Sequence, residues 1–206
     1  MFLTGNLIFI DQNFECPPSN PLSMLQCWLK TADQHGINEP RGMTLSTVDD
    51  LCRPSSRTVL IKECDEKGVI FVTSQTSAKG KNLDSHPWVA GTIWWRETIQ
   101  QINFQGQVTK LSDKKSDELF QVRPRAAQAV AEISQQSALL TNEQELKNKV
   151  VMRINSDIKI SRPKGWYAYK IIIESIEFWY GNKERFHRRL RYNLINDIWQ
   201  HQRLQP

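Results

Sequence analysis

The spacing of apolar residues changes along the chain, from a helical period at the start to a strand-like rhythm after it. Asn20 and Pro21 are typical of a helix start, with the asparagine as cap and the proline in the first turn. Apolar residues then recur at helical spacing as far as Gly36. Five short β-branched or aromatic runs follow between turn-forming residues, at 43–48, 58–61, 69–73, 89–95 and 99–111. The pattern predicts one helix and then an antiparallel sheet or small barrel.

Helical patterns dominate the middle of the chain, and an extended pattern returns near its end. Ser77 opens a predicted short helix over 77–85, between two of the strands. Further segments are a helix at 113–122, a helix at 126–138, a helix at 142–154, a loop at 155–164 and a strand at 166–173. The predicted fold class is mostly β or α+β, an antiparallel barrel with helices packed outside it.

Length and composition indicate a single compact unit. The chain has 206 residues, of which 39% are hydrophobic and 24% charged, enough for one substantial core. We expect one domain over residues 19–206, preceded by a flexible segment over residues 1–18. The apolar start lacks the basic residues and cleavage pattern of a signal peptide, and no window approaches the roughly 18 apolar residues of a membrane helix. A cytoplasmic protein with no membrane partner is therefore predicted.

The cysteines predict neither a disulfide framework nor a metal centre. They lie at positions 16, 27, 52 and 64, and these spacings match neither a CxxC redox pair nor a zinc knuckle. We expect free thiols in a reducing compartment and no metal site.

The charge of the chain raises one alternative function. The formal net charge is +5 and the pI is about 9.1, which would suit a nucleic-acid-binding protein. However, 22 carboxylates are spread among the 27 lysines and arginines, and no known nucleic-acid-binding motif accompanies them. Nucleic acid is not expected as a partner.

Residues 177–192 concentrate aromatic, arginine and histidine side chains. Trp179 offers a π face, Arg185 a planar fork for an anion, and His187 an imidazole. This combination suits a flat, anionic ligand. The alternative is a solvated basic face with a few residues anchored in the core.

Three other clusters carry candidate chemistry. Residues 57–62 form a strand with a basic residue near each end, which by itself is typical of surface charge. Ser77, Ala78 and Lys79 open a helix with a hydroxyl, backbone N–H groups and an ammonium, a competent cradle for phosphate. Amide side chains at 100–101 and 135–136 suit the edge of a heterocycle, although most such pairs face water.

In their order along the chain, these clusters resemble the pyridoxamine 5′-phosphate oxidase family, which consists of FMN-dependent split-barrel flavoproteins. The resemblance covers residues 21–206. It rests on Arg57-x-Val59-Leu60-x-Lys62, Phe71-x-Thr73, Ser77-x-Lys79, Gln101, Arg123-Pro124-Arg125, Gln136-Ser137, Glu177-Phe178-Trp179, Arg185-x-His187-x-Arg189, Trp199 and Arg203-Leu204-x-Pro206.

The resemblance implies a homodimer with FMN between the subunits and O2 as the final electron acceptor. The residues that match the family's FMN contacts are Arg57, Lys62, Val72, Thr73, Ser77, Lys79, Gln101, Gln136, Ser137, Trp179 and Arg189. Arg185 and His187 match its catalytic pair. Both are also expected to bind substrate, together with Lys62 and Arg123.

The departures from the family pattern bear on the substrate. Leu119 and Ala127 stand where the vitamin B6 enzymes have a tyrosine and a serine that grip the substrate phosphate, and Ala78 replaces an arginine near the FMN phosphate. The pattern from Trp88 to Ile102 and residues 184–192 instead resemble the phenazine-biosynthesis branch, whose substrates are flat and anionic without a phosphate. We expect an oxidase of a dihydrophenazine carboxylate. The alternatives are a pyridoxine/pyridoxamine 5′-phosphate oxidase and a non-catalytic flavin- or haem-binding module.

Overall fold

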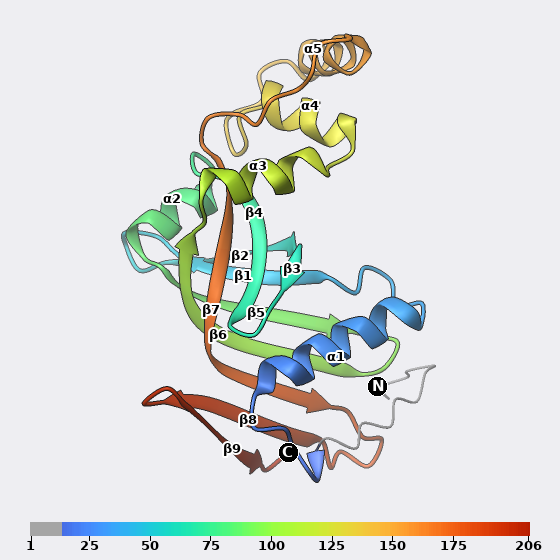
Figure 1. Cartoon of the computed structure of the whole chain (residues 1–206), viewed down its shortest axis with the longest axis vertical. Helices are drawn as coiled ribbons and strands as arrows, with labels where there is room; N and C mark the ends of the chain where they lie inside the picture. The colour runs from blue at the N-terminus through green and yellow to red at the C-terminus, as the bar shows by residue number, and fades with distance from the viewer. Residues whose placement is uncertain (1–13) are drawn as a thin grey trace.

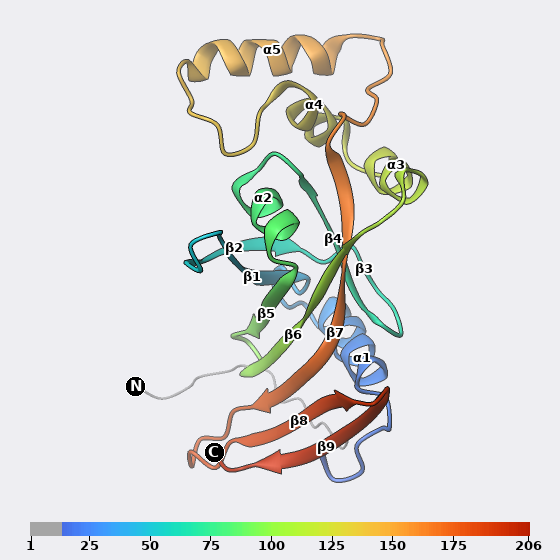
Figure 2. The same ribbon diagram turned by 90° about the vertical axis from the view of Figure 1, so that its left-hand side faces the viewer.

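The computed structural model describes residues 14–206, whose strands form one curved antiparallel sheet (Figures 1 and 2). The strands are β1 (Gly42–Val48), β2 (Pro54–Leu60), β3 (Glu63–Cys64), β4 (Gly68–Ser74), β5 (Trp88–Trp95), β6 (Gln100–Lys110), β7 (Trp166–Tyr180), β8 (Arg188–Ile195) and β9 (Ile198–Leu204). Their order is β2-β1-β5-β6-β7-β4-β3, and β8 and β9 continue from the far end of β7. The antiparallel barrel with peripheral helices is confirmed.

Strand β7 is the spine of the sheet, because three strands pair along it. Its first half pairs with β4 and its second half with β8, while β6 follows it over most of its length. The β6 register shifts between Gln105 and Gly106, where a Cβ on the glycine would lie 1.9 Å from the carbonyl oxygen of Ile172. This bulge allows the long strands to bend.

The helices are α1 (Pro21–Gln34), α2 (Ala78–Ser85), α3 (Asp113–Gln121), α4 (Arg125–Ile133) and α5 (Glu143–Asn155). Helix α1 begins as expected, since the side chain of Asn20 accepts a hydrogen bond from Leu22 N at 2.9 Å. Its apolar stripe, including Leu25 and Trp28, is buried in the main core with the inner face of the sheet.

Helices α3 to α5 form a cap at one end of β7, and the β8–β9 hairpin lies at the opposite end (Figures 1 and 2). A second, smaller core fills the cap, built around Phe120, Ala129, Ile160 and Trp166. Helix α5 contributes no buried residue. It is attached to the cap by the half-buried Val150 and Ile154, which pack against the second core, and by polar contacts.

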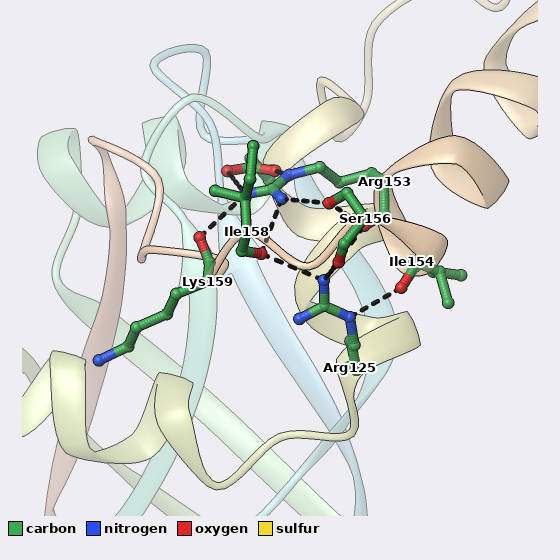
Figure 3. A network of polar contacts seen from close by, with 7 residues as sticks. Arg125, Arg153, Ile154, Ser156, Ile158 and Lys159 are labelled. Atoms are coloured by element: carbon green, nitrogen blue, oxygen red, sulfur yellow. Dashed lines mark hydrogen bonds and ion pairs between the residues drawn. The ribbon is translucent and has the colours of Figure 1, made fainter.

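Two arginines supply those contacts (Figure 3). Arg153 of α5 forms an ion pair with Glu132 of α4, with Nη2 3.0 Å from Oε1, and also donates to the carbonyl of Ile158. Arg125 donates to the carbonyls of Ile154, Ser156 and Ile158. The network fastens the end of α5 and the following segment to α4, the helix that leads into residues 134–138.

Four elements differ clearly from the sequence-based prediction. The strand expected at 166–173 continues to Tyr180, and residues 188–204 form two strands that the apolar pattern did not predict. The helix expected at 126–138 ends at Ile133, and Ser137 adopts a φ of 73°. Strand β8 was not predicted because only Leu190 and Tyr192 are buried in it, and the arginines beside them obscure the apolar alternation.

The flexible segment was predicted over residues 1–18. Most of it, residues 1–13, is outside the described part of the chain. Within residues 14–18, Phe14 is buried beneath the guanidinium groups of Arg188 and Arg203. The carbonyl of Pro18 accepts a hydrogen bond from the Tyr192 hydroxyl at 2.9 Å. The cysteines are free thiols, as expected. Among the helices of residues 14–206, none has the length and apolarity needed to cross a membrane.

Candidate functional site

The first group of predicted site residues surrounds the start of α2, directly after β4. Ser77 caps the helix, and its hydroxyl oxygen accepts a hydrogen bond from Gly80 N at 3.2 Å. A Cβ on Gly80 would lie 2.3 Å from the carbonyl oxygen of Ser74, so the close approach of helix and strand requires glycine. The N-terminus of α2 thereby lies next to the end of β4, where the helix dipole favours an anion.

Lys79 lies inside this group, with hydroxyls around its ammonium. Its Nζ donates to Thr73 Oγ1 at 3.2 Å and to Ser77 Oγ at 3.5 Å. All three residues are buried, and Lys79 is only 7% exposed. Burial, and after it the charge of Arg57, lower the pKa of Lys79.

Arg57 approaches the same group from β2. Its Nη1 donates to Thr47 Oγ1 at 2.7 Å, and its Nη2 donates to Ser55 Oγ at 2.6 Å. Burial lowers its pKa. Across residues 14–206, no carboxylate forms an ion pair with Arg57 or Lys79. Two neighbouring cations without a counterion form a site suited to an anion.

Gln136 and Ser137 complete this group from the loop after α4. Thr73 Oγ1 donates to Gln136 Oε1 at 3.3 Å, and Ser137 Oγ accepts a hydrogen bond from Ala78 N at 3.2 Å. The structure thus gathers Arg57, Thr73, Ser77, Lys79, Gln136 and Ser137, six of the predicted cofactor residues, into what we call the α2 group.

A cavity of about 650 Å³ adjoins the α2 group and is lined by Val72, Thr73, Gln136, Arg123 and Trp166, among others. The Arg123 guanidinium lies 5.2 Å from the centre of the Trp166 ring, and its Nη1 is buried and has no hydrogen-bond partner among residues 14–206. Burial lowers the pKa of Arg123. An unpaired buried donor of this kind suits an anionic ligand group in the cavity.

The second group of predicted residues forms one row across the outer face of the sheet. In register, Gln101 on β6 pairs with Trp179 on β7, which pairs with Arg189 on β8. Side chains directly opposite each other on neighbouring strands share a face. The neighbours Ile102, Phe178 and Leu190 point the other way into the core. We call Gln101, Trp179 and Arg189 the sheet row.

A buried carboxylate lies beside the sheet row. Glu177 accepts hydrogen bonds from Arg189 Nε at 2.7 Å and from Arg191 Nη2 at 2.7 Å. Burial would raise the pKa of Glu177, but the hydrogen bonds from Arg189 and Arg191 prevail and lower it. These residues line a groove of about 650 Å³ together with Gln101 and Trp179. One carboxylate facing two guanidinium groups leaves the groove positively charged.

The predicted catalytic pair lies on the turn between β7 and β8. The His187 ring centre is 4.6 Å from that of Trp179, and His187 Nδ1 accepts a hydrogen bond from Asn182 N at 3.1 Å. A neutral imidazole that accepts at Nδ1 carries its proton on Nε2. Arg185 is exposed on the same turn and has a φ of 67°, in the left-handed region.

Lys62 is a predicted residue that no side-chain hydrogen bond or ion pair within residues 14–206 joins to the α2 group or to the sheet row. It is exposed just beyond β2. Glu177 and Arg191 were not predicted as site residues. Each lies two positions from a predicted residue on the same strand, so strand alternation was the signal that could have identified them.

The two groups lie far apart within one subunit. Thr73 pairs with Tyr167 on β7, whereas Trp179 lies twelve residues further along the same strand. Twelve extended residues cover about 40 Å of strand. Figure 2 shows α4 at one end of β7, α2 beside the first half of the strand and β8 at the other end.

Two family models match the chain. Residues 29–157 match the model described as pyridoxamine 5′-phosphate oxidase. Residues 166–206 match the model described as the pyridoxine 5′-phosphate oxidase C-terminal dimerisation region. The first contains the α2 group and the second contains Trp179 and Arg189.

Individual relatives divide between two activities. The chain is 40% identical over 204 residues to dihydrophenazinedicarboxylate synthase of Pseudomonas chlororaphis, covering 99% of this chain and 92% of the relative. It is 38% identical over 189 residues to pyridoxine/pyridoxamine 5′-phosphate oxidase of Synechocystis sp., covering 91% of this chain and 88% of the relative. The crystal structure of PhzG from Burkholderia lata in complex with tetrahydrophenazine-1-carboxylic acid superposes with a TM-score of 0.94 at 34% identity, covering 98% of this chain and 100% of PhzG.

Proposed function

Because the chain belongs to the pyridoxamine 5′-phosphate oxidase family, we propose that it is an FMN-dependent oxidase of a dihydrophenazine carboxylate. Oxidoreductase activity is common to both sets of relatives, so the proposal concerns the cofactor, the substrate and the residues. The observation that carries it is the pair of chemically complementary groups, one basic and rich in hydroxyls, the other a row of aromatic, amide and guanidinium side chains.

The α2 group fits the phosphate of FMN. Lys79 and Arg57 supply two charges that lack a carboxylate partner, and Ser77 supplies a hydroxyl at a helix N-terminus. Charge-assisted donors of this kind are the contacts that a phosphate dianion requires. The buried ammonium of Lys79 costs stability without an anion beside it, and a bound phosphate would offset that cost.

The sheet row fits the ring system of the flavin. Trp179 presents a π surface, Gln101 an amide that both donates and accepts, and Arg189 a cation whose orientation is fixed by Glu177. A cation beside the ring stabilises negative charge on it. When bound, FMN would supply the two-electron acceptor that takes reducing equivalents from the substrate and gives them to O2.

The separation of the two groups supports a site shared between subunits. Between Tyr167, the partner of Thr73, and Trp179, strand β7 is about 40 Å long, which exceeds the length of one FMN, so we infer that the Thr73 end of the α2 group and the sheet row of one chain belong to different FMN sites. In a twofold dimer, the α2 group of one subunit meets the sheet row of the other, and two equivalent sites result. The match of residues 166–206 to a dimerisation region supports this arrangement.

The residues on the turn after β7 are suited to binding a flat, anionic substrate. His187 carries its proton on Nε2, so the neutral ring donates a hydrogen bond rather than accepting a proton there. We propose that His187 and Arg185 bind the substrate carboxylate, with the substrate ring stacked along the flavin. This assignment favours a positioning role for His187 over a role as general base.

The residues of the cap favour a phenazine over a pyridoxine phosphate as the substrate. Leu119 is buried in the second core and offers no hydroxyl, and Ala127 offers none either. Each missing hydrogen bond would weaken phosphate binding by about 0.5–1.5 kcal/mol. The unpaired buried Nη1 of Arg123 favours the second candidate, pyridoxine/pyridoxamine 5′-phosphate oxidase, because it could bind that phosphate. The free thiols are consistent with action in the reducing cytoplasm.

Anaerobic reduction of the FMN-loaded protein tests the proposal. We expect a dihydrophenazine carboxylate to bleach the flavin absorbance rapidly and pyridoxine 5′-phosphate to bleach it slowly, with recovery of the colour on admission of O2. Rapid bleaching by pyridoxine 5′-phosphate alone would assign the chain to vitamin B6 synthesis. A protein that takes up no FMN would refute both candidates.

A further inference from the structure

Trp94 is a large exposed aromatic residue that the proposed FMN site does not use. It lies near the end of β5 and is 44% exposed. Its neighbours along the strand, Ile93 and Trp95, are buried in the core. Strand alternation therefore places the Trp94 indole on the outer face, the face that carries the sheet row.

The register extends the sheet row to Trp94. Trp94 pairs with Gln101, which pairs in turn with Trp179. The ring centres of Trp94 and Trp179 are 6.2 Å apart with planes inclined at 56°, and His187 lies 4.6 Å beyond Trp179. Three rings from β5, β7 and the β7–β8 turn thus form one continuous aromatic surface.

The surroundings of this surface are basic. Arg189 lies in the same row, and Arg185 and the Nε2–H of His187 lie on the adjoining turn. An aromatic surface bordered by guanidinium groups binds flat anions, because the rings provide dispersion and the cations hold the charge at the edge. A ligand with several fused rings covers more of this surface than a ligand with a single ring.

We propose that Trp94 and His187, the rings next to Trp179, form an aromatic subsite for the outer ring of a fused polycyclic carboxylate beside the flavin, and that Trp94 selects such substrates over single-ring substrates. The inference rests on the proposed function and adds a specificity residue to it. Trp94 acts on the part of the substrate that extends beyond a single ring, so removing its π surface weakens large ligands selectively.

Equilibrium binding to the FMN-loaded protein tests the subsite. The probes are oxidised phenazine-1-carboxylate and pyridoxal 5′-phosphate, followed by the change in flavin absorbance or by calorimetry. In Trp94→Leu we expect the Kd for the phenazine to rise about tenfold, with at most a twofold change for the single-ring ligand. Trp94→Phe keeps a π surface and should retain most of the phenazine affinity.

Trp88→Leu is the matched control, because Trp88 lies on the same face of β5 and is half exposed but pairs with Gln107, away from the sheet row. It should leave both Kd values unchanged. Equal weakening of both ligands in Trp94→Leu, an unchanged Kd for the phenazine, or conversion of the dimer to a monomer on size exclusion would overturn the inference.

Turnover separates this inference from the proposed function. If the wild type oxidises a dihydrophenazine carboxylate but Trp94→Leu binds phenazine-1-carboxylate normally, the function stands and the subsite fails. If the wild type does not oxidise that substrate but Trp94→Leu selectively loses phenazine binding, the subsite stands and the proposed reaction fails.

Discussion

At the scale of single residues, Lys79 shows how a binding site can oppose stability. Its ammonium is buried among hydroxyls, and no carboxylate of residues 14–206 neutralises it. Its pKa is lowered by burial and then by Arg57, so protonation is less favourable in the fold than in the unfolded chain. Folding therefore bears a cost at neutral pH, and this cost disappears above the unfolded pKa of 10.5.

Lys79→Met is expected to stabilise the cofactor-free protein by about 1 kcal/mol, because an apolar side chain of similar length replaces a buried charge. The same change should raise the Kd for FMN at least about tenfold, since a charge-assisted phosphate contact is lost. Urea unfolding without FMN and fluorescence titration with FMN measure the two effects.

The exposed Lys114 provides the matched control. Lys114→Met should change neither the free energy of unfolding nor the Kd for FMN. A Lys79→Met variant that binds FMN as tightly as the wild type would remove Lys79 from the cofactor site.

The residues of the α2 group were predictable from the sequence only through their resemblance to a family motif. Ser77 and Lys79 open a helix in a pattern too short to be specific, and Thr73 and Gln136 are 63 positions apart, so no local signal shows that their side chains touch. Arg191 was missed because its strand was not recognised, although it alternates with Arg189 on the same face.

At the scale of elements, Glu177 of β7 stabilises the pairing of this strand with β8. This carboxylate lies between Arg189 and Arg191, and its hydrogen bonds to them lower its pKa below the ordinary value of 4.5 despite its burial. A carboxyl with a lowered folded pKa stabilises the protein above its unfolded pKa, and the stabilisation is lost as the pH falls through the folded pKa.

Glu177→Gln should destabilise the protein by about 1–3 kcal/mol at neutral pH, because two guanidinium groups lose their shared counterion. The difference between variant and wild type should shrink as the pH falls below 4.5, where the wild-type carboxyl begins to lose its advantage. Urea unfolding across this pH range measures the difference. A difference that is constant with pH would show that the hydrogen-bond geometry, and not the charge, is what matters.

The elements with a regular apolar pattern were predicted well and those with a charged pattern were not. Strands β4 and β5 place β-branched and aromatic residues together, and α1 has both a cap and an apolar stripe. Strand β9 has no buried residue, so alternation could not reveal it. Helix α4 ends before its apolar pattern does, because residues 134–138 turn toward Thr73 and Ala78 through Gln136 and Ser137.

At the scale of the whole molecule, strand β7 determines that the proposed site is shared. The resemblance to the family implies an FMN between two subunits, but the motifs along the sequence contain no information on how far apart β7 holds its two ends. Only the length of the strand, with β4 paired at one end and β8 at the other, shows that the α2 group and the sheet row are distant. In a monomer, the α2 group and the sheet row would be two halves of an FMN site that cannot come together.

Mixed dimers test this division directly. We expect Lys79→Met and Trp179→Ala each to retain little FMN alone, but a co-expressed mixture should recover about a quarter of the wild-type flavin, because half of the dimers are mixed and each has one intact site. The matched control mixes Lys79→Met with Arg57→Ala, two changes in the α2 group. Its mixed dimers have a defect at both sites and should recover nothing. Flavin absorbance after desalting measures the content, and recovery in both mixtures, or in neither, would contradict a site built from two subunits.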